Sequence, residues 1–383
     1  MKKTIARLVL LALVAALFIG CETEPRKDTT GMKVALITDY ADIDDKAYNQ
    51  AAYEAARAWC EENEVDFTYD RPTGDSTVAR VAAIDKAVAD GYNVLLLPGY
   101  AFAGAIVETV EANADVKFVA LDVSEYDLQD ARGTADDFSW EYPANLYACV
   151  YREELAGYLV GYAAVKLGYR RLGYVGNMAV PAVVRYGYGF LQGVNDAAVE
   201  LGIQDEIELK HVYHNCFCTE HIEPWIASWF EGGTEVVFAC GGGIYKEAGR
   251  AAEKCGGRLI GSDVDMAPVI DGNYGAGMTV TSAVKGLAAT VRTQLDRIAC
   301  GSFEGGTVEN LGIVSENPKE NYVQLPASTQ WAEGRFTESD YQALVSDLLN
   351  GKHTVSDQSE TPPALEIHVD YQGNIVDLSS KAD

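Results

Sequence analysis

The chain has 383 residues, more than one ordinary hydrophobic core organises, so two lobes are expected. An apolar content of 48% and 36 glycines are typical of a compact α/β protein rather than a disordered chain. The formal net charge of −27 makes nucleic-acid polymers and anionic membrane faces poor partners, because an acidic surface repels phosphate groups. Neutral and cationic small molecules remain open as ligands.

The N-terminus has the pattern of an export signal. Three basic side chains precede an apolar run over 8–19, which is too short to span a membrane comfortably. Gly20 and Cys21 end the run and a polar segment follows, as in bacterial lipoprotein signals. We therefore expect a signal peptide over 1–20, lipid on Cys21 and a tether over 21–31 that anchors the protein outside the cytoplasmic membrane. An ordinary secretory signal with an incidental cysteine is the alternative.

From residue 33 onward, patterns typical of strands and helices alternate. This order implies parallel sheets with right-handed crossovers. Residues 123–150 are rich in acids and aromatics without a regular pattern, and a second series of elements begins after them. The predicted strands are 33–38, 66–69, 93–97, 117–121, 171–175, 208–213, 235–240, 258–262 and 277–281, and the predicted helices are 46–60, 76–90, 102–113, 151–167, 184–201, 220–231, 244–255, 283–299 and 337–349.

The two series predict an α/β protein of two lobes, each a parallel sheet flanked by helices. Two similar lobes in an exported and tethered chain indicate a binding protein that closes on its ligand by hinge motion. The expected boundaries are 32–145 plus about 266–300 for lobe 1, 146–265 plus about 301–350 for lobe 2, and 351–383 for a C-terminal tail with a possible hairpin of arms 365–369 and 375–378.

The turn between the first strand and the first helix carries the most informative polar residues. Four carboxylates fall within the seven residues 39–45, and Tyr48 and Asn49 follow in the first helical turn. Such a turn lies at the carboxyl edge of the sheet, where open α/β folds bind ligands. Helix capping and loop solvation account for one or two of the acids. They do not account for the aromatic and the amide, so this turn is expected to contribute to a ligand site.

Six segments, in order over residues 33 to about 290, resemble the basic membrane lipoprotein family, a group of substrate-binding lipoproteins that includes nucleoside receptors of ABC importers. The segments are Thr38-Asp39 with Asp45-Lys-Ala-Tyr-Asn49, Val116-Lys-Phe-Val-Ala-Leu-Asp122, Glu153-Glu-Leu-Ala-Gly-Tyr-Leu-Val-Gly161, Gly173-Tyr-Val-Gly-Asn-Met178 with Gly189-Phe190, Ile260-Gly-Ser-Asp-Val-Asp265, and Thr281-Ser-Ala-Val-Lys285.

The resemblance implies a type I periplasmic-binding-protein fold, with two lobes joined by crossover hinge strands and a purine nucleoside in the cleft between them. It also implies a lipid anchor on Cys21, the permease subunits of an ABC importer as partners, and no cofactor or enzymatic activity.

The same resemblance assigns contacts to the base. Tyr48 stands where the family has a phenylalanine that stacks on the base, and Phe217 falls near the second stacking aromatic. Asn49 and Asp39 stand where polar contacts reach the base edge. Stacking on two aromatic side chains is worth roughly 1–3 kcal/mol for each.

Contacts to the sugar follow in the same way. Asp122 lies at a strand end that faces the cleft, and Asp263 and Lys285 match contacts to the ribose hydroxyls. An ionised carboxylate in a dry cleft accepts such hydroxyl hydrogens at roughly 1.5–3 kcal/mol for each bond.

Two other functions stay open. Nucleoside hydrolases also have acid-rich turns, whose spaced carboxylates chelate calcium. If Asp44 and Asp45 anchor that pattern, the upstream ligand positions are Thr38 and Tyr40, which supply no carboxylate. A binding protein for a sugar or another small polar solute is the second alternative.

A cluster of histidines and cysteines is a conceivable zinc or copper set. Its spacing matches no tight structural zinc site, so a strand end with incidental polar residues is favoured and no metal is expected. The remaining cysteines are scattered and are expected to be small buried residues rather than a disulfide framework. The cluster comprises His211, His214, Cys216, Cys218 and His221.

Two predicted helix starts carry further features. Gly242, within the run Gly241 to Gly243, lacks the following Lys-Ser/Thr of a phosphate-binding P-loop. Close backbone approach to a ligand, or a plain tight turn, is expected there. Glu153 and Glu154 are expected to be a solvated first helical turn.

Overall fold

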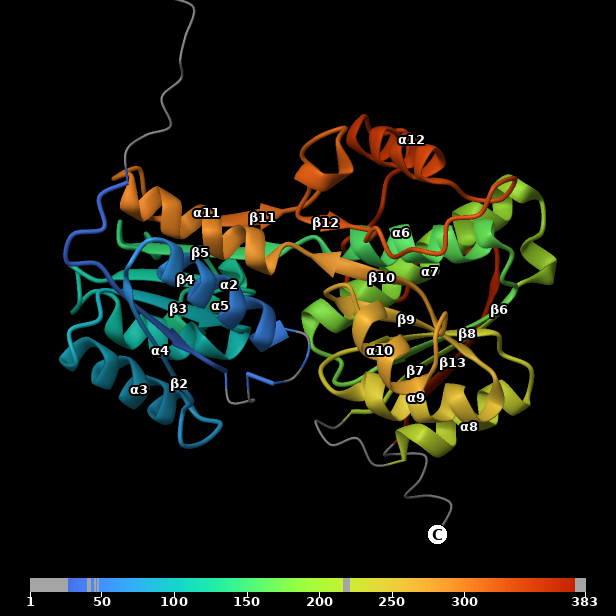
Figure 1. The fold of residues 1–383 in the computed structure, drawn as a ribbon, viewed down its shortest axis with the longest axis horizontal. Helices are drawn as coiled ribbons and strands as arrows, with labels where there is room; N and C mark the ends of the chain where they lie inside the picture. The colour runs from blue at the N-terminus through green and yellow to red at the C-terminus, as the bar shows by residue number, and fades with distance from the viewer. Residues whose placement is uncertain (1–26, 40–42, 45, 47, 216–220, 376–383) are drawn as a thin grey trace, which may run out of the picture.

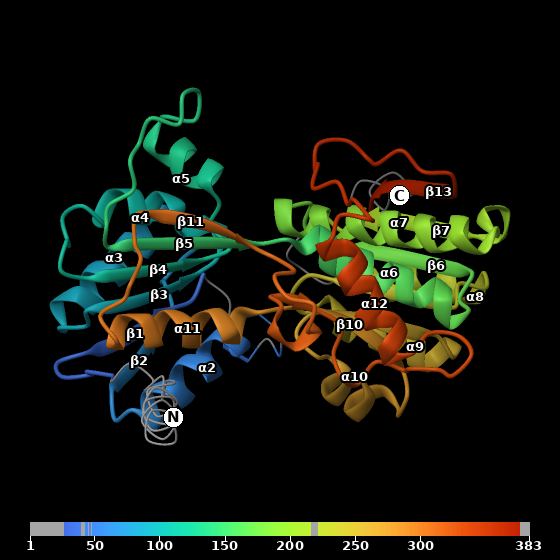
Figure 2. The same cartoon turned by 90° about the horizontal axis from the view of Figure 1, so that it is seen from above.

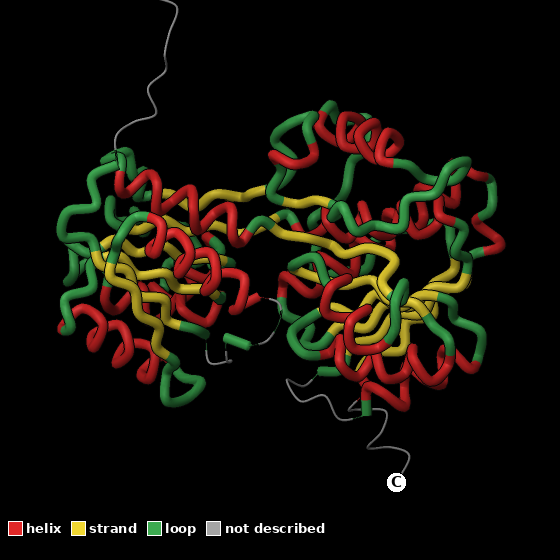
Figure 3. The backbone as a smooth tube through the Cα atoms, in the orientation of Figure 1, coloured by secondary structure: helices red, strands yellow, loops and turns green. Residues whose placement is uncertain are grey.

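The computed structural model describes residues 27–39, 43–44, 46, 48–215 and 221–375. They form two lobes that lie side by side, each with strands at its centre and helices outside (Figure 1, Figure 3). The predicted fold class of two α/β lobes is confirmed.

The first lobe contains a sheet of six parallel strands in the order β11-β5-β4-β3-β1-β2. Successive strand residues point to opposite faces. Leu36 and Leu96 therefore pack with helices α2 and α11, whereas Ala35 and Leu95 pack under α3, α4 and α5. The elements are β1 (Lys33–Ile37), α2 (Tyr48–Glu62), β2 (Asp66–Asp70), α3 (Thr77–Ala89), β3 (Val94–Pro98), α4 (Ala103–Thr109), β4 (Lys117–Leu121), α5 (Glu125–Arg132), β5 (Leu146–Tyr151), α11 (Leu287–Ala299) and β11 (Thr307–Leu311).

The second lobe contains a seven-stranded sheet in the order β12-β10-β9-β8-β6-β7-β13, parallel except for β12 against β10. Helices α6 and α7 cover one face, and α8, α9 and α10 cover the other. The elements are α6 (Glu153–Leu167), β6 (Arg171–Gly176), α7 (Pro181–Leu201), β7 (Glu208–Tyr213), α8 (Ile222–Glu231), β8 (Val236–Cys240), α9 (Ile244–Cys255), β9 (Arg258–Asp263), α10 (Ala267–Tyr274), β10 (Thr279–Lys285), β12 (Val323–Gln324), α12 (Glu338–Leu349) and β13 (His368–Asn374).

The chain passes between the lobes three times: from β5 to α6, from β10 to α11 and from β11 to β12 (Figure 2). This differs from the expected boundaries. β5 pairs within the first sheet, whereas the expected boundaries place 146–151 in lobe 2. β10 pairs within the second sheet, whereas those boundaries place 279–285 in lobe 1. β11 likewise belongs to the first sheet. The physical reason is that alternation identifies a strand but not the sheet that it joins, which is set by distant partners.

Two local predictions are wrong. Residues 123–150, expected to be irregular, contain α5 and β5, and α5 begins with a capping box between Ser124 and Asp127. The expected hairpin turn around Gln372 lies inside β13, which pairs in parallel with β7. Most of the second hairpin arm, 375–378, lies outside the described residues.

Helices α6 and α7 cross at unusually close range because both present glycines to the contact. A Cβ added to Gly157 would lie 2.1 Å from the carbonyl oxygen of Tyr186, and one added to Gly189 would lie 2.0 Å from that of Glu154. A Cβ added to Gly193 would lie 2.1 Å from the carbonyl oxygen of Tyr158. This contact brings the N-terminal turn of α6 against α7, and with it two charged residues of the site described next.

Candidate functional site

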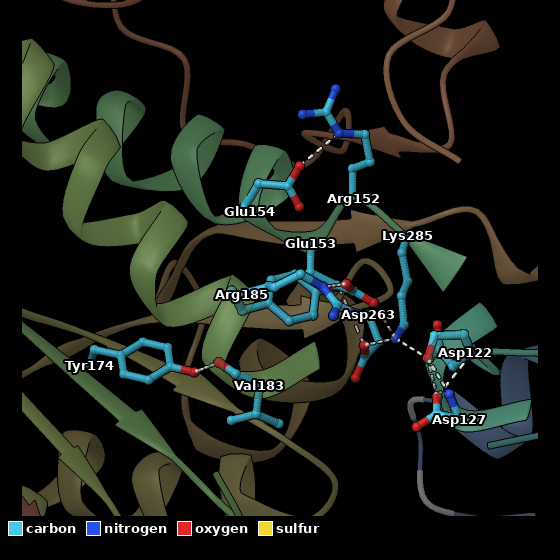
Figure 4. Close-up of polar contacts among 12 residues, drawn as sticks. Asp122, Asp127, Arg152, Glu153, Glu154, Tyr174, Val183, Arg185, Asp263 and Lys285 are labelled. Atoms are coloured by element: carbon cyan, nitrogen blue, oxygen red, sulfur yellow. Dashed lines mark hydrogen bonds and ion pairs between the residues drawn. The ribbon is translucent and has the colours of Figure 1, made fainter. Parts of the chain in front are cut away.

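The carboxyl ends of strands from both sheets meet at one buried amine. Lys285, the last residue of β10, has 3% of its side chain exposed. Its Nζ lies 2.5 Å from Oδ2 of Asp122, which follows β4 of the first lobe. It also lies 3.5 Å from Oδ1 of Asp263 at the end of β9 and 3.5 Å from Oε1 of Glu153 at the start of α6 (Figure 4). The ammonium thus joins the two lobes through carboxylates from each.

A second cation supports this cluster from α7. Arg185 Nε lies 2.7 Å from Oε2 of Glu153, whose side chain is fully buried. The cluster therefore contains three carboxylates and two cations, so its formal negative charges outnumber its positive charges by one. Buried carboxylates left without such partners would be strongly destabilising.

The two charge types respond differently to burial. Burial opposes the charged form of Lys285, but Asp122, Asp263 and Glu153 outweigh that effect and raise its pKa well above the ordinary value. Burial also raises the pKa of Glu153, and the attraction of Arg185 and Lys285 opposes that rise only in part. Lys285 is therefore charged at neutral pH.

Three tyrosine rings surround the ammonium. Lys285 Nζ lies 4.9 Å from the ring centroid of Tyr48, 5.6 Å from that of Tyr151 and 5.8 Å from that of Tyr186. Their faces attract a cation, which adds to the charge compensation. The Tyr48 hydroxyl donates to the carbonyl of Leu121 at 3.2 Å and so fixes the ring. A base that stacks on Tyr48 must use the face away from the amine or displace it.

Asp122 and Asp263 both have left-handed backbone conformations, with φ of 56° and 69°. Such values are strained for residues other than glycine and are tolerated best by Asp and Asn. Backbone strain of this kind occurs most often at functional sites. Oδ1 of Asp122 is buried and has no hydrogen-bond partner within the described ranges, so it can accept a ligand hydroxyl.

A second group lies at the carboxyl end of β1. Asn49 Nδ2 donates to Oδ1 of Asp39 at 3.3 Å, and Arg80 Nε donates to the backbone carbonyl of Asp39 at 3.1 Å. A Cβ added to Gly99 would come within 3.0 Å of the Cβ of Asp39. Glycine after β3 therefore permits the close approach of these two turns. They lie where β2 and β3 flank β1 on opposite sides, which is the switch point of the first sheet.

The predicted site residues fall into three sets. Tyr48, Asp122, Asp263 and Lys285 share one cluster, and Asp39 and Asn49 contact each other. Gly242 is exposed in a tight turn with φ of 53° and contacts none of these residues. Phe217 lies outside the described residues.

Sequence analysis did not predict four members of the Lys285 cluster, which are Glu153, Arg185, Tyr151 and Tyr186. Glu153 and Glu154, expected to be solvated, have 0% and 1% of their side chains exposed, because α6 is buried on nearly all sides. The apolar run that follows Glu154 was the available signal, since a helix apolar all round is buried. No local pattern marks Arg185, Tyr151 or Tyr186, because their contacts come from distant segments.

Part of the metal hypothesis can be examined. In the portion of the chain that the structure covers, no three His, Cys, Asp or Glu side chains are arranged to hold a metal ion. His211 is buried, stacks on Tyr174 at a centroid distance of 4.9 Å, and burial lowers its pKa to about 3. His211 is therefore a neutral core residue, whereas Cys216 and Cys218 lie outside the described residues.

None of the helices described here has the length and apolar character to cross a membrane.

Comparisons with known proteins identify the family of the chain. The profile of Bmp, described as ABC transporter substrate-binding protein PnrA-like, matches residues 32–338. The ABC transporter nucleoside-binding protein BmpA of Lactococcus lactis is 24% identical over 383 aligned residues, which cover 93% of this chain and 99% of that protein.

Solved structures show the same fold. A solute-binding protein of an ABC transporter system from Aeropyrum pernix has a TM-score of 0.67 at 17% identity and covers 86% of this chain and 94% of its own. Another from Conexibacter woesei has a TM-score of 0.66 at 20% identity, with coverage of 85% and 99%. The chain belongs to the Bmp family of PnrA-like ABC transporter substrate-binding proteins.

Proposed function

We propose that this substrate-binding protein takes up a purine nucleoside between its lobes and delivers it to the permease of an ABC importer. The observation that carries the proposal is the position of Lys285, which pairs with Asp122 of one lobe and Asp263 of the other. A ligand that hydrogen-bonds to these groups touches both lobes at once. The name of the Lactococcus relative supports a nucleoside as the ligand.

The chemistry of the cluster suits a neutral polyol. A ribose diol donates two hydrogen bonds, which Asp122 and Asp263 can accept, and its oxygens can accept from the Lys285 ammonium. The excess negative charge disfavours a phosphate group, so the proposed ligand is a nucleoside rather than a nucleotide. Tyr48 and Asn49 supply an aromatic face and an amide near the same place for the base.

Membership of the family bears on the hydrolase alternative, whereas a free sugar as the ligand is tested by experiment. Its members are substrate-binding proteins of ABC transport and not enzymes, so the hydrolase hypothesis is excluded. A free sugar could also satisfy the carboxylates, but it would make no use of Tyr48. Inosine that binds while ribose does not separates the two ligands.

Replacing Asp263 by Asn tests the sugar contacts. Asn tolerates the left-handed backbone at this position, so the change removes the charge with little added strain. We expect the free energy of inosine binding to become less favourable by about 1.5–3 kcal/mol, which is the contribution of a charge-assisted hydrogen bond. Tyr48→Phe keeps the ring and loses the bond to Leu121, and is expected to weaken binding by less than about 1 kcal/mol. Isothermal titration calorimetry measures both, and equal small losses would place the site elsewhere.

We further propose that lipid on Cys21 anchors the protein on the outer side of the cytoplasmic membrane. The support is the short apolar run before Gly20 and Cys21 and the polar tether after them. Cys21→Ser is expected to release the protein from the membrane fraction, because serine has no thiol to carry the proposed lipid. Fractionation followed by immunoblotting measures this. A variant that stays in the membrane fraction at wild-type level would contradict the lipid anchor.

A further inference from the structure

Glu153 differs from the other two carboxylates around Lys285 in where it lies. It is the first residue of α6, directly after the first passage between the lobes, and its side chain is 0% exposed. The side chains of Asp122 and Asp263 are 13% and 9% exposed. Asp122 directly follows a strand of the first lobe, and Asp263 ends a strand of the second. Glu153 is therefore the most deeply buried of the three carboxylates around Lys285.

The two oxygens of Glu153 have separate partners. Oε2 lies 2.7 Å from Arg185 Nε, a bond fixed by the planar guanidinium. Oε1 lies 3.5 Å from Lys285 Nζ and makes no hydrogen bond to any residue that the structure describes. Arg185 thus holds the carboxylate while the free oxygen faces the amine (Figure 4).

We propose that Glu153 is a positioning residue of the ligand site: clamped by Arg185, it holds the Lys285 ammonium in place while Asp122 and Asp263 turn to the ligand. This inference rests on the proposed function. A ligand hydroxyl that donates hydrogen bonds to Asp122 and Asp263 competes with Lys285 for these two carboxylates. Glu153 is fully buried and held by Arg185, so it remains the counter-ion of Lys285 in the bound state. Buried amines need such a partner to stay charged.

The next residue offers a matched control. Glu154 has 1% of its side chain exposed, and its Oε1 lies 2.7 Å from Arg152 Nε. Burial raises the pKa of its carboxyl, as it does for Glu153. Figure 4 shows the Arg152–Glu154 pair apart from the Lys285 cluster. Glu153→Gln and Glu154→Gln therefore remove comparable buried charges from one helical turn, but only the first removes a partner of Lys285.

The first measurement is calorimetric titration of the full-length protein and its variants with inosine. We expect Glu153→Gln to weaken inosine binding about tenfold or more, whereas Glu154→Gln changes it less than about twofold. A merely structural role would affect both variants alike. If Glu153→Gln fails to fold, Arg185→Lys replaces it. This change keeps the charge but loses the planar clamp, and at least about threefold weaker binding is expected.

The second measurement needs no ligand. The ¹⁵N signal of a buried, paired lysine ammonium is observable by NMR when its protons exchange slowly, and Lys285→Arg assigns it by its loss. We expect this signal in the wild type and in Glu154→Gln, and its shift or disappearance in Glu153→Gln. An unchanged signal together with inosine affinity within about twofold of wild type would overturn the positioning role. A wild type that binds no nucleoside would instead contradict the proposed function, and the NMR result would still decide the role of Glu153.

Discussion

Replacing Lys285 by methionine is expected to lower the free energy of unfolding by about 3–5 kcal/mol at pH 7. The change leaves Asp122, Glu153 and Asp263 buried together with Arg185 as the remaining cation of the cluster. Breaking a buried charge cluster in this way costs more than removing an exposed pair, because the remaining charges stay out of water. Urea unfolding followed by circular dichroism measures the loss.

The pH dependence gives this prediction a sign. The pKa of Lys285 is raised on folding, so its stabilisation is fully present at pH 7 and is lost only at strongly alkaline pH. In the variant, carboxyls without their cation have raised folded-state pKa values. The folded state then takes up protons that the unfolded state does not bind, and its stability increases as the pH falls. The deficit of Lys285→Met should therefore shrink between pH 7 and pH 5.

Lys86 provides the control. Its side chain is 65% exposed and lies 2.9 Å from Asp70 and 3.6 Å from Asp90, so it also has two acidic partners. Exposed pairs contribute little, and Lys86→Met is expected to change stability by less than about 0.5 kcal/mol. Equal losses from the two variants, or a Lys285→Met deficit that does not depend on pH, would contradict the account of the buried cluster.

Gly189→Ala is expected to lower the free energy of unfolding by about 3 kcal/mol, at the upper end of the cost of overpacking a core. The added methyl group would lie 2.0 Å from the carbonyl oxygen of Glu154 and 2.7 Å from its carbonyl carbon. These are backbone atoms, so no side chain can rotate out of the way. Helices α6 and α7 must separate, which also loosens the contact between Glu153 and Arg185. Thermal and urea unfolding measure the loss.

Gly272→Ala is the matched change in a helix. Gly272 lies exposed in α10 and a Cβ there would meet no atom within 4 Å. Alanine has the higher helix propensity, so stability should rise by about 0.4–1 kcal/mol. If Gly189→Ala were as well tolerated as Gly272→Ala, the close α6–α7 packing would be wrong.

The sequence allowed most elements of the fold to be predicted, because buried parallel strands and amphipathic helices have distinct periodicities. Strand β4 and helix α9 have the predicted bounds. The sheet that each strand joins is harder to predict from the sequence. β10 and β11 pair with strands far away in the chain, and nothing in their own residues distinguishes one sheet from the other. β5 was missed because its six residues follow a long polar segment.

The site divides in the same way. Asp122 and Asp263 directly follow predicted strands, so the rule that ligands bind at carboxyl edges supports them together with the family resemblance. Lys285 ends β10 in the structure but lies inside the predicted helix 283–299, so only the family resemblance identified it. Glu153 escaped this rule because it begins a helix, where acids are usually solvated caps. Its burial depends on the glycine contact between α6 and α7, which becomes visible only when both helices are in place.

Small-angle X-ray scattering of the purified protein, with and without saturating inosine, tests the central claim most directly. Asp122 belongs to the first lobe and Asp263 to the second, so a ligand held by both binds the closed arrangement more tightly and shifts the population toward it. About 3–5 kcal/mol of differential affinity suffices to move a mostly open population to a mostly closed one. The account predicts a smaller radius of gyration with inosine. A radius that stays the same at saturating inosine would contradict binding between the lobes.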